Sequence, residues 1–140
     1  MGNRTIAFAA WVAACSIFAA RAALAELPPS AYVAQQKMAP EFLVLEIVNV
    51  NAQGSAPNAI VVDVRAKVKK VHRTESGVAE GAEILVRYFI PPTPSAGHVG
   101  PSSPPILQAG TFVPAYLKNE GRSYGLASGG KSFTTVTWPP

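Results

Sequence analysis

The sequence predicts an all-β fold, a small closed or partly open barrel of five or six strands. Apolar and polar residues alternate with period two in Ile60–Val71 and Glu83–Ile90, the pattern of half-buried strands. Further apolar, β-branched stretches recur at short intervals between Gly- and Pro-containing turns, as they do in small barrels. Seven of the 13 prolines lie between Pro91 and Pro114, a density that excludes a helical bundle.

The first 25 residues have the pattern of a cleavable signal peptide. Their start is basic, residues 5–20 are apolar and uncharged, and a small-x-small site ends at Ala25 before a polar, Pro-rich segment. We therefore expect cleavage after Ala25 and a periplasmic or secreted protein. Two alternatives would place the chain at a membrane. One is a retained anchor, although the apolar run is short of the roughly 20 residues that span a bilayer. The other is lipidation of Cys15, which ends a lipobox-like VAAC.

Removal of the signal peptide would leave a mature chain without cysteine, because Cys15 is the only one. Disulfides and thiolate metal sites are then excluded, and the fold depends on its core. The formal charge of the mature chain is +2, and nucleic-acid-binding domains usually carry a stronger basic footprint. We expect no nucleic-acid partner, and we interpret the basic residues between Arg65 and Arg73 as a solvated strand face.

A lead-in over residues 26–41 precedes the β-domain, which we expect to span residues 42–138. Within the lead-in, Ala31–Ala39 is suited to one short helix, which the following proline would end. The first strand is predicted at Phe42–Val50, an apolar run that would be buried on much of both faces. A loop over Asn51–Asn58 should follow it, because this stretch contains glycine and proline.

The next two strands are the clearest elements of the sequence. In Ile60–Val71 the valines and Ala66 lie on one face and charged residues on the other, and the phase shifts after Lys69, which predicts a β-bulge. A Gly-containing turn leads into Glu83–Ile90, which alternates again. We expect these two strands to pair antiparallel with Val64 and Val86 in the core.

The last third of the chain should supply the remaining strands. One is predicted at Thr111–Leu117, where Pro114 indicates an edge or a bulge. A hairpin-type turn at Asn119–Gly121 follows. Two short strands, Arg122–Ala127 and Lys131–Trp138, should then lie on either side of a Gly-rich turn.

Three stretches form a recognisable succession of strands and turns: Ile60–His72 (IVVDVRAKVKKVH), Gly81–Pro92 (GAEILVRYFIPP) and Leu107–Leu117 (LQAGTFVPAYL). The first is a long strand that ends in basic residues, the second begins with glycine and ends in a proline loop, and the third is an L-x-x-G turn into a strand with a tyrosine. In this succession of strands and turns the chain resembles the netrin-like module, the OB-type barrel of tissue inhibitors of metalloproteinases. The resemblance implies a five- to six-stranded OB-like (netrin-like) barrel. In that family an N-terminal cysteine chelates the zinc of the target protease. The mature chain would start at Glu26 and has no cysteine, so the inhibitory chemistry is not implied.

Residues Gly125–Ser132 (GLASGGKS) match the phosphate-loop pattern G-x-x-x-x-G-K-S. That loop requires a helix directly after it, whose N-terminal N–H groups hold the phosphates. The residues after Ser132 are instead β-prone, and an exported protein has little access to nucleoside triphosphates. We therefore interpret the match as a Gly-rich turn between strands and expect no nucleotide and no other cofactor.

No catalytic constellation is visible in the sequence. The two histidines, His72 and His98, have no acidic neighbour, and no G-x-S-x-G elbow exists. No close His/Asp/Glu spacing indicates a metal site. We therefore expect a protein that is not an enzyme, with no catalytic and no metal-ligating residues.

The long connection Pro91–Pro105 is the most distinctive segment, and it is interpreted either as a semi-rigid connector or as a docking surface. We expect a non-enzymatic binding or accessory protein that interacts with another envelope or secreted protein. The alternative is a small periplasmic metal- or ligand-binding protein that uses His98 and this loop. The candidate partner-binding residues are His98, Pro101, Pro104, Pro105 and Trp138.

Overall fold

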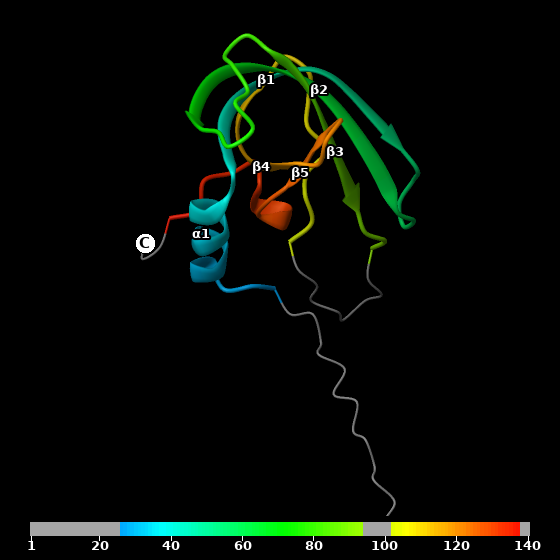
Figure 1. Ribbon diagram of the computed structural model, residues 1–140. Helices are drawn as coiled ribbons and strands as arrows, with labels where there is room; N and C mark the ends of the chain where they lie inside the picture. Colours follow the sequence, from blue (N-terminus) through cyan, green and yellow to red (C-terminus); the bar gives the residue numbers. More distant parts are fainter. Residues whose placement is uncertain (1–25, 94–101, 138–140) are drawn as a thin grey trace, which may run out of the picture.

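The structure is a computed structural model that describes residues 26–93 and 102–137, and it is a closed five-stranded β-barrel with one short α-helix (Figure 1). Its elements are α1 (Pro29–Met38), β1 (Glu41–Gln53), β2 (Ile60–Arg73), β3 (Glu83–Ile90), β4 (Phe112–Asn119), β5 (Tyr124–Leu126) and the 3-10 turn η1 (Gly129–Lys131). The order around the barrel is β1-β2-β3-β5-β4, with β4 closing against β1. These findings confirm the predicted all-β, OB-like fold class. The expected signal peptide lies outside the described residues.

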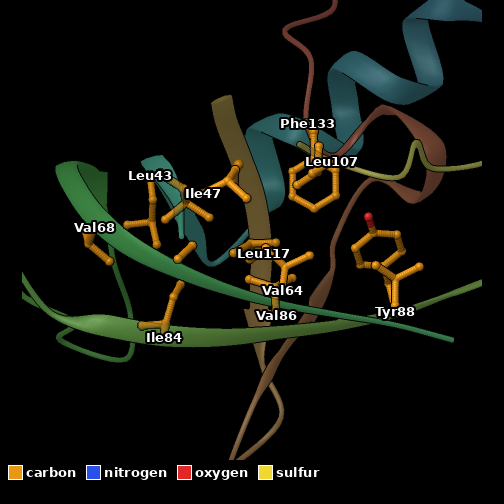
Figure 2. Close-up of a cluster of buried hydrophobic side chains, with 14 residues drawn as sticks. Leu43, Ile47, Val64, Val68, Ile84, Val86, Tyr88, Leu107, Leu117 and Phe133 are labelled. Carbon is orange, nitrogen blue, oxygen red and sulfur yellow. The ribbon is translucent and has the colours of Figure 1, made fainter. Parts of the chain in front are cut away.

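The core lies inside the barrel, where alternate residues are buried in β1 as far as Ile47, in β2 from Val62 to Val68 and in β3 from Ile84 to Tyr88. Val64 of β2 is opposite Val86 of β3 in an antiparallel pair, as the alternation predicted, and both side chains are fully buried. Leu107 and Phe133, which lie outside the strands, fill the end of the barrel next to Tyr88 (Figure 2). The rings of Tyr88 and Phe133 are 5.5 Å apart, in a tilted arrangement.

Two β-bulges bend β2 along β1. Val68 and Lys70 of β2 pair with Leu45 and Val44, which are adjacent residues of β1. Lys69 is therefore the extra residue of a bulge, at the place where the phase shift predicted one. A second extra residue is His72. Bulges increase strand twist and curvature, and a five-stranded sheet needs this curvature to close.

The proline in β4 lies where the strand has no partner on one side. Tyr116 donates its backbone N–H to the carbonyl of Ser132, away from β1, so the backbone of Pro114 faces the same side. On that side β5 pairs only with Leu117–Asn119. The missing N–H therefore removes no ladder hydrogen bond, and the expected edge position is confirmed.

The helix α1 lies beside the barrel, next to the C-terminal part of the described chain (Figure 1). Arg73 at the end of β2 donates from Nε to the carbonyl of Ala39 (2.7 Å) and from Nη2 to that of Gln36 (2.8 Å). These contacts satisfy carbonyls that a helix C-terminus leaves unpaired. In the described part of the chain no helix is long and apolar enough to cross a membrane.

The largest differences from the sequence prediction lie at the end of β1 and in the C-terminal segment. The strand β1 continues to Gln53, three residues into the expected loop. The expected final strand Lys131–Trp138 is wrong over its described part, because η1 and an irregular segment occupy residues 129–137. Backbone groups of this segment bond the backbone N–H of Tyr116 in β4 and the side chain of Gln36, but the segment does not pair as a strand.

Candidate functional site

The predicted partner-binding residues fall into two groups. His98, Pro101 and Trp138 lie outside the described residues. Pro104 is buried, so its ring is not part of the surface, whereas Pro105 is exposed. The carbonyl of Pro105 accepts a hydrogen bond of 2.6 Å from the hydroxyl of Tyr88, which attaches the end of the Pro-rich connection to β3.

This attachment has a pH dependence. Burial raises the pKa of Tyr88 to about 12, from 10.0 for a free tyrosine. An acid whose pKa is raised by folding stabilises the protein below its unfolded pKa, and the contribution is lost as pH rises from about 10 to 12. We expect a loss of stability over this interval that is smaller in Tyr88→Phe. Denaturant midpoints of both proteins at pH 9 to 12 measure it, and an identical decline in the two would contradict the assignment.

The phosphate-loop match is a packed turn in the structure. Ser132 is fully buried, and its Oγ accepts the backbone N–H of Ser128 at 2.9 Å. A Cβ on Gly130 would collide with the carbonyl of Ser102, so the close approach of two backbone segments explains this glycine. The three-residue η1 follows β5, and no second strand follows η1 within residues 132–137. The expected turn is present, but it does not connect two strands.

Three of the basic residues of β2 make contacts within the molecule, and two of these three pair with acids on the neighbouring strands. Arg65 bonds Glu83 at 2.5 Å, and Lys69 lies 3.2 Å from Glu46. Arg73 binds the helix carbonyls described above. These contacts favour a solvated strand face over an anion-binding patch, and exposed ion pairs of this kind add little stability.

A buried carboxylate lies at the first residue of β1. Glu41 is fully buried, and its Oε1 accepts the backbone N–H of Ser76 at 2.9 Å. The hydroxyl of Ser76 lies 2.9 Å from that of Tyr124. Glu41 thus holds the turn that follows β2, which is a structural role. Among the described residues, no group of three or more His, Cys, Asp or Glu side chains is placed to hold a metal ion.

The most distinctive surface feature is a stack of three rings from three strands. The ring of Phe42 in β1 lies 4.5 Å from that of His72 in β2 and 4.5 Å from that of Tyr116 in β4, and the three rings are nearly parallel. Tyr116 is buried, Phe42 is half-buried and His72 is exposed. A groove of about 200 Å³ lies beside the stack, between α1 and the C-terminal segment.

The stack continues along the barrel as an apolar strip with a basic border. On the outer face, Val44 of β1 is opposite Pro114, and Glu46 is opposite Phe112, whose side chain is 60% exposed. We define the ring strip as Phe42, Val44, His72, Phe112, Pro114 and Tyr116. On the β2 side, Lys70 is opposite Val44 and Lys67 is opposite Glu46. The ring strip thus combines exposed apolar surface with two lysines along one side.

Sequence reasoning missed the ring strip because its members are far apart in the chain. Only the register of β4 with β1, and the bulge at His72, bring the rings together. One signal was present: Phe42 and Val44 alternate with the core residues of the same strand, so they point outward.

Comparisons of the chain with models of protein families, with curated proteins and with solved structures found no match. The resemblance to the netrin-like module therefore stays a prediction.

Proposed function

We propose that the chain is an exported, non-enzymatic binding protein that contacts another envelope or secreted protein through the ring strip. The main observation behind this proposal is that Phe112 is exposed and belongs to the same outer surface as the stacked rings of Phe42 and Tyr116. Aromatic residues are enriched at protein interfaces, and rigid ones lose little conformational entropy on binding. Phe42 is held between two rings, so its position is already fixed.

The border of the ring strip indicates the chemistry of the partner. Lys67 and Lys70 are exposed on the strand next to the strip, and Glu46 is engaged by Lys69. A protein surface that places acidic groups beside an apolar centre fits this arrangement. Because exposed charges are screened by salt, binding should weaken as ionic strength rises. The export of the chain is part of the proposal, and it rests on the signal-peptide pattern of residues 1–25.

The test is capture of the partner from an envelope fraction of the host, with crosslinking, using protein expressed from the full coding sequence. We expect Phe112→Ser to lower the affinity for the captured partner about tenfold or more, as loss of an interface anchor does. Phe89→Ser is the matched control, since Phe89 is 54% exposed on the outer face of β3. The free energy of unfolding of both variants, obtained from denaturant unfolding, should stay within about 1 kcal/mol of the wild-type value.

Two results would contradict the proposal. A loss of binding in Phe89→Ser but not in Phe112→Ser would place the interface on β3 instead of the ring strip. Substrate turnover by the purified protein, abolished by a single substitution, would show that the chain is an enzyme.

A further inference from the structure

The strand β1 is longer than the strand that covers one of its edges. It pairs with β2 as far as Gln53, but with β4 only over Glu41–Glu46. The backbone of Ile47 then bonds Thr111 (2.9 Å) and Gly110 (2.7 Å). Within residues 26–93 and 102–137, no strand other than β2 pairs with Asn49–Gln53. The hairpin formed by β1 and β2 projects on the side away from α1 (Figure 1).

This free edge has little of the protection that strand edges usually carry. Natural edges are blocked by lysines, prolines or bulges. Asn49–Gln53 (NVNAQ) contains no charge and no proline, and the irregularity at Val48 lies before it. All of its residues are exposed except Val50, which packs partly against the core. The segment is therefore an available template for a further strand.

We propose that this edge pairs with the same edge of a second copy, to form a two-fold symmetric dimer through antiparallel β1 strands. The residue pattern is self-complementary about Asn51. With Asn51 on the axis, Asn49 lies opposite Gln53 on one face and Val50 lies opposite Ala52 on the other. Polar side chains therefore meet polar ones and apolar side chains meet apolar ones, as an isologous interface requires. A charged partner strand would find no complement in this neutral segment.

The dimer does not depend on the proposed function, because the two surfaces are separate. The residues of β1 in the ring strip are Phe42 and Val44, whereas the free edge proposed for dimerisation begins at Asn49. A dimer joined at the far end of the β1–β2 hairpin would leave both ring strips exposed. Two strips in one particle raise the effective affinity for a partner that displays repeated sites.

Sedimentation equilibrium of protein expressed from the full coding sequence tests the proposal, at concentrations from about 1 to 200 µM, the range suited to a small interface. We expect a reversible monomer–dimer equilibrium. Asn51→Lys should raise its dissociation constant about tenfold or more, because two like charges then face each other across the axis. Within each subunit position 51 lies opposite Asp63, so the fold accommodates the lysine. Phe89→Lys is the control, since it adds the same charge on β3.

A charge swap makes the test specific. Asn51→Glu faces Asp63 within its own subunit, where Arg87 already binds Asp63, and its denaturant midpoint is measured to show that it folds. Asn51→Glu alone should also prevent dimerisation, and an equimolar mixture of the two position-51 variants should restore it, because opposite charges then meet across the axis. Three results would overturn the proposal. They are a wild-type protein that stays monomeric throughout, a dimer that Asn51→Lys leaves unchanged, and an equal loss in Phe89→Lys.

Discussion

Replacement of Val64 with aspartate is expected to remove about 4 kcal/mol or more of stability, enough to unfold much of the protein. Val64 is fully buried in the middle of β2, opposite Val86 on one side and Val50 on the other. The substitution loses about 1.5–3 kcal/mol of apolar burial and also places a carboxylate without a partner in the core. Denaturant midpoints measure the loss.

The same strand offers a matched control. Val61 has the same side chain but points to the outer face of β2, where it is 43% exposed opposite Phe89. Val61→Asp should cost less than about 1 kcal/mol, because its carboxylate stays hydrated. Equal losses in the two variants would mean that the inner and outer faces of β2 are assigned wrongly.

The strands β2 and β3 could be predicted because their signals are local. Alternation with period two identifies the buried face within a single strand, and one break in that phase located the bulge at Lys69. Both signals need only neighbouring residues. The antiparallel pairing of the two strands then follows from the connection over residues 74–82, which is shorter than the crossover that parallel strands need.

The surface features could not be predicted in the same way, because they depend on register between distant segments. The ring stack requires that Phe42 lie opposite Tyr116, and the free edge requires that β4 pair with only half of β1. Neither the register nor the length of a pairing is encoded in the pattern of one strand. The sequence contains the residues that make these surfaces, but it does not show which of them lie next to each other in space.

The expected final strand shows a further limit of local patterns. Residues 131–137 are rich in threonine and valine, which favours a strand. In the structure β5 already pairs with both β3 and β4, and this closure leaves no edge for a sixth strand beside it. The segment instead takes its hydrogen bonds from α1, an element almost 100 residues earlier in the chain.

Gln36 is the residue that makes this connection, and its replacement is expected to release the C-terminal segment from the barrel. The side chain of Gln36 is 4% exposed. Its Nε2 donates to the carbonyls of Lys131 (2.9 Å) and Thr134 (2.7 Å), and its Oε1 accepts the N–H of Val136 (3.0 Å). Leucine has a similar volume, but it removes the partner of the Thr134 carbonyl and of the Val136 N–H, and it leaves the Lys131 carbonyl only the 3.4 Å bond from the N–H of Thr134.

We expect Gln36→Leu to cost about 3 kcal/mol, since each buried backbone group without a partner costs about 1–3 kcal/mol and part of the segment can become hydrated. Gln35→Leu is the control, because Gln35 lies on the same helix and makes one long contact, 3.4 Å, with Ser128. It should cost less than about 1 kcal/mol. Amide exchange at Val136 separates local release from global unfolding, since release exposes that amide while Val64 in β2 stays protected. Unchanged protection at Val136 in Gln36→Leu would show that the segment is held by Phe133 and the backbone alone.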